Sequence, residues 1–257
     1  MSKISVRLMA LMLLVSFTVQ AEVSVPSIFG SRMVLQRGQV NPVWGWAAPG
    51  EKISVTFAGQ KHTATAGKDG AWRVKLQPLK ANAKGQTLTI QGSNKLELID
   101  VLVGEVWVCS GQSNMAWSVD RSYDPDLESL TAKFPNIRLI SVPPVGTQEP
   151  QKDFNGEWVA ASPESVMSFS AVGFFFGRTL HQAINVPVGL IDNAWGGSAA
   201  EAWVRRDLLN KLPAAAPYMA TWKQTEANYD HEKTMATYET RLKKWQTAAA
   251  AARKAGK

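Results

Sequence analysis

A short polar turn in the middle of the chain carries residue types suited to nucleophilic catalysis. The segment Ser110-Gly111-Gln112-Ser113-Asn114-Met115 follows a largely apolar run at 100–109, which predicts a buried strand. A serine on the sharp turn after a strand can project its hydroxyl into a cleft, while the backbone N–H groups after it point toward a developing oxyanion. A polar turn of this kind is also typical of a plain helix N-cap, so the turn alone leaves both interpretations open.

Strands alternating with helices must position this turn. Two further apolar runs, at 136–142 and 186–195, predict strands, and the stretch 165–184 has the length and apolar face of a helix. Strands joined by helical crossovers favour a parallel sheet that is covered on both faces. Ligands of such sheets collect beyond the carboxyl ends of the strands, so we expect chemistry after Cys109 and after Ala194.

The stretch before this sheet, residues 22–100, alternates apolar and polar residues in the way that predicts β-strands. Turn-forming residues separate the alternating segments, which is typical of a small sandwich. Its predicted core residues are all aromatic: Trp44, Trp46, Phe57 and Trp72. A packing domain is favoured over a carbohydrate-binding module, because the pattern itself carries no function.

The first 21 residues predict a secretory signal peptide, 1–21, that is cleaved after Ala21. Lys3 and Arg7 precede an apolar run, Leu8–Val19, and small residues occupy the cleavage positions. The run is about a dozen residues long, whereas a membrane-spanning helix needs roughly 20. We therefore expect an exported, periplasmic or secreted protein with no membrane anchor after cleavage. Since Cys109 is the single cysteine, the chain makes no internal disulfide.

The net charge of +7 does not indicate a nucleic-acid-binding protein. Two basic residues lie in the predicted leader and nine lie after Asp207, whereas 17 basic residues face 17 acidic ones between Glu22 and Asp207. Binding to a phosphate backbone needs Lys and Arg clustered on one face, and this balance argues against it. The three His and the one Cys form no ligand cluster in the sequence, so no metal site is expected.

Two long strings of this sequence resemble a known family. They are Glu105–Met115 and Gly189–Ser198, and Glu201-Ala202-Trp203 follows the second. Together they resemble the sialate O-acetylesterases and related carbohydrate acetylesterases of the SGNH/GDSL hydrolase class. The stretch Pro26–Phe57 also resembles the β-domain that begins those proteins. The resemblance implies an N-terminal β-sandwich-like domain, 22–100, followed by an SGNH-type parallel-sheet α/β domain.

The resemblance also implies roles for individual residues. Ser113 would be the nucleophile that attacks the acetyl carbonyl. Its own N–H and that of Gly196 or Gly197 would form part of the oxyanion hole, although the two glycines could instead be only a tight turn. Neighbours that could contact a sugar substrate are Gln112, Asn114, Trp195 and Trp203, with Trp107 and Trp117 as further stacking candidates. No metal or organic cofactor is implied.

The departures from the family pattern concern the catalytic base. The family's Gln-Gly-Glu segment, which completes the oxyanion hole, and its Asp-x-x-His pair, which supplies the base, do not occur in this sequence. A serine hydroxyl is a weak nucleophile unless a positioned base takes its proton. We expect His62 to be a surface strand residue, His181 a helix-end residue and His231 a solvated tail residue. The base is therefore predicted to be missing from this chain.

Residues 208–257 predict a basic helical tail, because they are rich in Ala, Lys, Glu and Thr. The tail adds no further strand to the α/β pattern of 101–207. We therefore expect 101–207 to be only the first part of the α/β domain. The chain would stop inside an inserted helical segment, as a fragment or a truncated gene product.

Three functions from different classes remain open. The favoured one is a serine esterase that removes O-acetyl groups from sialic acid or a related glycan sugar. The second is a catalytically inactive glycan-binding or vestigial protein. The third, a structural or interaction protein built on the β-domain, explains neither motif. Which acetylated sugar is bound depends on the walls of the cleft, and the sequence does not reveal them.

Overall fold

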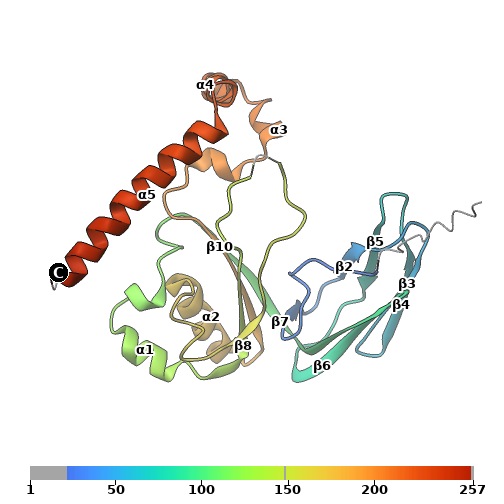
Figure 1. The fold of residues 1–257 in the computed structure, drawn as a ribbon. Helices are drawn as coiled ribbons and strands as arrows, with labels where there is room; N and C mark the ends of the chain where they lie inside the picture. The colour runs from blue at the N-terminus through green and yellow to red at the C-terminus, as the bar shows by residue number, and fades with distance from the viewer. Residues whose placement is uncertain (1–21, 148, 256–257) are drawn as a thin grey trace, which may run out of the picture. The chain divides into compact units, whose positions relative to one another are not determined.

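The computed structural model describes residues 22–147 and 149–255, which divide into two compact units between Gly197 and Ser198. The predicted signal peptide, 1–21, lies outside the described residues. The first unit contains a large mixed sheet of order β4-β3-β6-β7-β10-β8-β9, in which β1 also pairs with β7 (Figure 1). Its strands are β1 Val34–Gln36, β2 Asn41–Trp46, β3 Lys52–Phe57, β4 Gln60–Thr65, β5 Ala71–Leu76, β6 Asn82–Gln91, β7 Lys95–Gly111, β8 Phe134–Ser141, β9 Val159–Ala161 and β10 Val188–Ala194. Its helical segments are η1 Val119–Arg121, α1 Pro125–Thr131 and α2 Ala171–Ile184.

The N-terminal β-structure has one shared core. β2 and β5 form a separate antiparallel pair, and their apolar residues pack together with those of β3 and β6. Every second residue of β5 is buried, as the alternation in the sequence predicts. Phe57 and Trp72 lie in this core, so the prediction is confirmed for these two residues.

The prediction was wrong for Trp46, which lies outside the core cluster and is only half-buried. The inward positions of β2 are Val43 and Gly45, so strand alternation turns Trp44 and Trp46 to the other face. Trp72 fills the space above Gly45, where an added Cβ would stand 2.9 Å from the Trp72 ring. Trp44 packs on the edge of the core, with its ring edge-to-face against Phe29.

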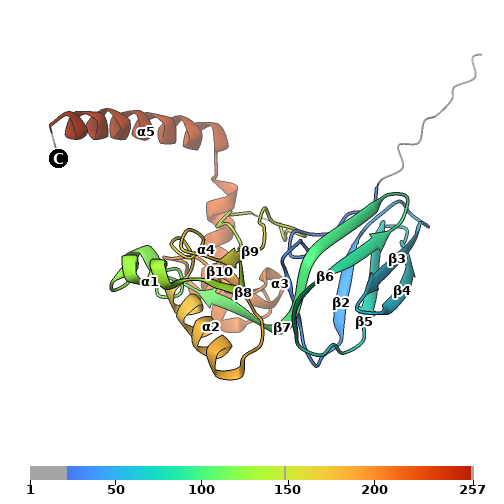
Figure 2. The same cartoon turned by 90° about the horizontal axis from the view of Figure 1, so that it is seen from below.

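Three strands of the α/β part are parallel: β10 pairs with β7 on one side and with β8 on the other. Figures 1 and 2 show α2 lying against this part of the sheet. The helix approaches closely because Gly177 faces Leu190, where an added Cβ would stand 2.6 Å from the leucine side chain. α2 begins at Ala171 rather than at 165, since the Ser170 side chain accepts a hydrogen bond from the Gly173 N–H and caps the helix there.

The two predicted parts of the first unit share one strand. β7 runs unbroken through the boundary that the sequence predicts at 100/101. Its first half pairs with β6 and β1, and its second half pairs with β10. The domain limits 22–100, 101–207 and 208–257 stay predictions, but the strand that would carry the nucleophile is rooted in the β-structure.

The second unit, Ser198–Lys257, is helical over its described residues. Its elements are η2 Ala200–Trp203, α3 Arg206–Leu209, η3 Pro213–Ala215, α4 Ala216–Ala227 and α5 His231–Lys254. The Asp230 side chain caps α5 by accepting a hydrogen bond from the Lys233 N–H. Neither α4 nor α5 has a buried residue. Across the described ranges, no helix has the length and apolarity needed to cross a membrane.

Candidate active site

The structure brings the two sequence motifs together at the carboxyl ends of β7 and β10. The parallel register places Ala194 opposite Gly111, and the Trp195 N–H donates to the Gly111 carbonyl at 2.9 Å. The chain then turns so that Gly196 lies beside Ser113: a Cβ added to Gly196 would stand 3.7 Å from both Cα and Oγ of Ser113. This edge of the sheet is where parallel α/β sheets bind their ligands.

The two glycines of the second motif occupy different positions. Gly196 lies next to Ser113, whereas Gly197 has a φ of +81° and no atom within 4 Å of a Cβ added to it. A φ in this region favours glycine because a side chain would be strained there. Gly197 therefore makes the turn, and Gly196 is the glycine whose backbone lies near the serine.

Ser113 is exposed on a compact turn. The turn closes when the Ala116 N–H donates to the Gln112 carbonyl at 2.9 Å, and Gly111 enters it with a φ of +143°. The Ser113 hydroxyl donates to Oε1 of Gln112 at 2.8 Å. A side-chain amide cannot take the proton at neutral pH, so this bond orients the hydroxyl without activating it. Asn114 is exposed on the same turn.

The histidines have other partners. His62 on β4 donates from Nε2 to Oε1 of Gln60 at 3.0 Å, and His181 near the end of α2 donates from Nδ1 to the Val186 carbonyl at 2.7 Å. His231 belongs to the second unit, where it lies 3.2 Å from the Tyr229 hydroxyl. Within the described residues, no histidine has a hydrogen bond to Ser113.

A buried cysteine lies below the turn, on the face of β7 that α2 covers. A Cβ added to Gly173 would stand 2.8 Å from the Cys109 sulfur, which shows how closely the helix approaches it. Burial, and then the charge of Asp192, raise the pKa of the Cys109 thiol to about 11. Because the thiolate is the reactive form, Cys109 is not a nucleophile near neutral pH.

Asp192 is a half-buried carboxylate that the sequence analysis missed. It lies opposite Cys109 in the strand register. Burial raises the pKa of Asp192, and this effect is larger than the opposite effect of the hydrogen bonds from the Ala194 and Ser170 N–H groups. Its Oδ1 atom is buried and has no hydrogen-bond partner among the described residues. The sequence signal was present, since Asp192 interrupts the apolar run of β10 and an acidic residue is rarely buried unless it is paired.

Ser170 links α2 to the turn. Its hydroxyl caps the helix and lies 3.4 Å from the sulfur of Met115, the last residue of the first motif. The Ala171 N–H also donates to the Trp117 carbonyl at 2.8 Å. The N-terminus of α2 therefore braces the segment that carries Ser113.

The candidate stacking residues fall in different places. Trp195 is exposed beside the turn, and Trp117 is exposed with its indole N–H bound to the Arg121 carbonyl. Trp107 packs edge-to-face on Phe176, with ring centroids 5.0 Å apart. Trp203 lies in the second unit, where its indole N–H donates to the Ser198 hydroxyl at 2.8 Å. Of the candidate substrate-binding residues, Gln112 and Asn114 are the chain neighbours of Ser113, and Trp195 precedes Gly196, which lies beside it.

The described residues hold no group of three His, Cys, Asp or Glu side chains that could bind a metal ion. What the site does offer is an accessible hydroxyl, a glycine backbone beside it and aromatic surface nearby. Such an arrangement suits attack on an ester carbonyl once a base is supplied.

Comparison with known proteins assigns the chain to a class of enzymes, the carbohydrate esterases. A family model described as carbohydrate esterase, sialic acid-specific acetylesterase, matches residues 103–254, which is more than half of the chain. The chain therefore belongs to the sialic acid-specific acetylesterase family of carbohydrate esterases.

Individual relatives agree with this assignment. Human sialate O-acetylesterase is 34% identical over 197 residues, which cover 69% of this chain and 38% of the human protein. The rat sialate O-acetylesterase is 32% identical over 203 residues, which cover 71% of this chain and 38% of the rat protein. The crystal structure of a carbohydrate acetylesterase from Xanthomonas citri superposes with a TM-score of 0.68 at 38% identity, covering 71% of this chain and 42% of that one. The chain thus spans well under half the length of the relatives it matches.

Proposed function

We propose that the chain is part of a serine esterase that removes O-acetyl groups from sialic acid or a related glycan sugar. The observation that carries the proposal is the placement of Ser113 beside Gly196, at the carboxyl ends of two parallel strands. The names of the relatives, sialate O-acetylesterase and carbohydrate acetylesterase, support the acetylated sugar as substrate.

In the proposed reaction the Ser113 Oγ attacks the carbonyl carbon of the acetyl group. The oxyanion that forms accepts hydrogen bonds from the N–H groups of Ser113 and Gly196. The sugar oxygen then leaves as an alcohol with the proton taken from Oγ, and water releases acetate from the acyl-serine in a second, matching step. Each oxyanion donor of this kind contributes about 3 to 4 kcal/mol of transition-state stabilisation.

The proton transfer needs a base that the described residues do not place at Ser113. Before attack, the Ser113 hydroxyl must also exchange its bond to Gln112 for a bond to that base. We infer that the base and a third oxyanion donor come from polypeptide beyond the matched segment, in the length that the relatives possess and this chain does not span.

The alternative is a protein that binds the acetylated sugar at the same place and does not catalyse. The bond between Ser113 and Gln112 favours it for the chain alone, since a hydroxyl held by an amide is not activated. In that case Trp195 and the polar turn would bind an acetylated glycan without turnover.

The test uses a complete enzyme made by joining residues 22–257 to the remaining length of the Xanthomonas citri acetylesterase. Ser113→Ala should abolish release of acetate from O-acetylated sialic acid, because it deletes only the nucleophilic oxygen. Ser110→Ala is the matched control, since Ser110 is also exposed and lies near the end of the strand that leads to Ser113. A fluorophosphonate probe should label Ser113 alone. An unimpaired Ser113→Ala enzyme, or labelling at another serine, would show that the nucleophile is elsewhere.

We also propose that the protein is exported, to the periplasm or the medium, after cleavage behind Ala21. The basic start and short apolar run of the first 21 residues support this. N-terminal sequencing of the protein from its native host should find Glu22. Intact Met1 in the cytosol would contradict the proposal.

A further inference from the structure

A polar cavity lies in the first unit, away from the candidate active site. Its volume is about 320 Å³, and its walls come from the segment before β1 and the segment before β9. The side chains that matter are Ser27, Phe29, Ser31, Arg32, Glu157 and Trp158. The Arg32 N–H donates to the carbonyl of Ile99, near the start of β7, whereas Ser113 follows the end of that strand.

The loop that forms one wall is fixed from several sides. The Ser27 N–H donates to Oδ1 of Asp153 at 2.7 Å, and the Trp158 indole N–H donates to the Ile28 carbonyl at 2.9 Å. The Ser31 hydroxyl accepts from the Ile99 N–H at 3.0 Å. The backbone of a wall held in this way is formed before a ligand arrives, so it needs no ordering on binding.

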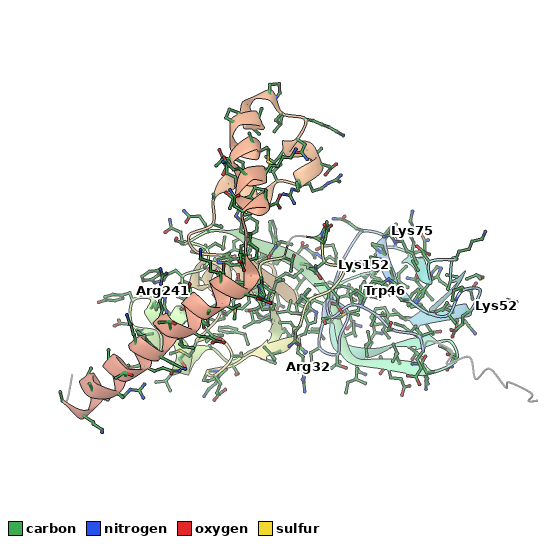
Figure 3. The ribbon with its side chains drawn as sticks, turned by 45° about the horizontal axis from the view of Figure 1, so that its top comes forward. Arg32, Trp46, Lys52, Lys75, Lys152 and Arg241 are labelled. Carbon is green, nitrogen blue, oxygen red and sulfur yellow. The ribbon has the colours of Figure 1, made fainter. Side chains whose placement is uncertain are left out.

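Arg32 has a backbone conformation that arginine rarely adopts. Its φ is +69°, in the left-handed region that usually holds glycine or asparagine. The conformation is enforced by the bond to Ile99 and by the buried Arg138, whose guanidinium donates to the Arg32 carbonyl at 3.3 Å. Strain of this kind persists where the surroundings impose it, often at ligand sites. Here it displays the Arg32 side chain at the edge of the β-structure (Figure 3).

The polar groups at the cavity have unused bonding capacity. Among the described residues, neither the Arg32 guanidinium nor the Glu157 carboxylate has a hydrogen bond or an ion pair. The Ser31 hydroxyl accepts a bond but still has its own proton to donate. Phe29 and Trp158 are buried and supply the apolar part of the wall. The cavity thus combines a cation, an anion, a hydroxyl donor and an apolar surface.

We propose that this cavity binds one carboxylated sugar unit of a glycan, separately from the esterase centre. The planar guanidinium of Arg32 suits a carboxylate, with which it forms two parallel hydrogen bonds. Glu157 accepts hydrogen bonds from sugar hydroxyls, and the apolar wall contacts the C–H groups of the ring. The volume lies at the lower end of the roughly 300 to 1,000 Å³ of small-molecule sites, which is room for a single sugar. The inference goes beyond the proposed esterase and does not depend on it.

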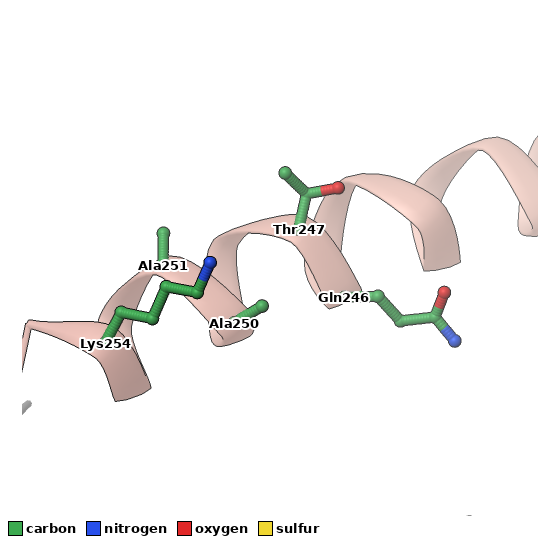
Figure 4. A pocket seen from close by; sticks show the side chains of 5 residues that line it. All are labelled: Gln246, Thr247, Ala250, Ala251 and Lys254. Carbon is green, nitrogen blue, oxygen red and sulfur yellow. The ribbon is translucent and has the colours of Figure 1, made fainter.

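Another hollow, on α5, carries no comparable inference. Its lining residues, Gln246, Thr247, Ala250, Ala251 and Lys254, all belong to one helix (Figure 4). A single exposed helix cannot enclose a ligand on several sides, whereas two separate segments of the chain line the Arg32 cavity.

The test is a nuclear magnetic resonance titration of the full chain that follows the indole N–H signal of Trp158. The probes are methyl glucuronide and methyl glucoside, which differ only at C6, where the first has a carboxylate and the second a hydroxymethyl group, and acetate, which has the carboxylate without the sugar. We expect the glucuronide to bind roughly tenfold more tightly than the glucoside, as one charge-assisted bidentate pair predicts. Equal affinity for the two sugars, or shifts by acetate as strong as those by the glucuronide, would overturn the proposal.

The variant that carries the test is Arg32→Asn, which removes the guanidinium and suits the left-handed backbone. It should keep the fold and abolish the preference for the glucuronide. Lys75→Asn is the control for charge loss, since Lys75 is exposed on β5, away from this cavity. Ser113→Ala should leave the preference unchanged, so this result is independent of the esterase activity. A preference that survives Arg32→Asn, with the melting temperature unchanged, would refute the site.

Discussion

The two halves of β7 have similar residues and opposite environments. In the first half, Leu102 is 1% exposed, because β6 and β1 flank the strand on both sides. In the second half, where β10 is the one partner strand within the described residues, Trp107 is 45% and Val108 61% exposed. Apolar residues in one continuous strand thus become core or surface according to their neighbours.

The hydrogen bonds of β7 identify its open side. The Glu105 N–H donates to the Pro187 carbonyl, toward β10, while the Val106 N–H points the other way and donates to Oε1 of Gln36 at 2.7 Å. Backbone groups alternate along a strand, so those of Val108 and Ser110 point away from β10 as well. No partner strand within the described chain receives them. The open edge ends at the turn that carries Ser113, so an element added there would reach the candidate active site.

The largest expected effect concerns catalysis at the turn that follows the second half of β7. Met1–Lys257 alone should hydrolyse p-nitrophenyl acetate at least roughly a thousandfold more slowly than the Xanthomonas citri acetylesterase. Serine hydrolases without a base keep only the advantage that binding and the oxyanion hole provide. Steady-state rates of the two proteins, measured side by side, check the prediction.

A turnover rate of the chain alone that is close to that of the Xanthomonas citri acetylesterase would contradict this prediction. His181→Ala and His231→Ala would then show whether one of these histidines is the base. If activity survived both substitutions, His62 would be the next residue to test.

A smaller effect concerns stability along β7. Leu102→Ala should lower the free energy of unfolding by about 2 to 5 kcal/mol, because it leaves a cavity among well-packed neighbours. Val108→Ala should change it by no more than about 0.5 kcal/mol, since the side chain is largely in water. Urea unfolding of the two variants and the parent measures both values. If Val108→Ala lowered the free energy of unfolding as much as Leu102→Ala does, the second half of β7 would be covered in solution.

The contrast along β7 also explains how far the sequence could be used for prediction. The apolar runs predicted β8, β10 and the position of the Ser113 turn, because those features depend on local pattern and strand direction. The resemblance proposed Gly196 and Gly197 together, and only the backbone geometry separated the neighbour of Ser113 from the turn residue. Trp46 and Asp192 were missed because burial depends on which face a neighbouring element covers. Strand alternation puts Val108 and Cys109 on opposite faces, but nothing in the composition indicates that α2 covers the face of Cys109.

The last prediction concerns Cys109, which lies on the face of the second half of β7 that α2 covers. Cys109 points under α2, and burial raises its thiol pKa from the ordinary value near 9.0 to about 11. The unfolded chain therefore releases the thiol proton at lower pH than the folded chain does. The stabilisation due to the neutral thiol is complete below pH 9 and is lost as the pH rises toward 11, by about 2 to 3 kcal/mol in total.

Cys109→Ala has no proton to release, so its unfolding free energy should fall less steeply than that of the parent over this range. The difference between the two unfolding free energies, measured by urea at pH 8, 9, 10 and 11, isolates the contribution of the thiol. Parallel curves would mean that water reaches Cys109, and that the second half of β7 is open on both faces.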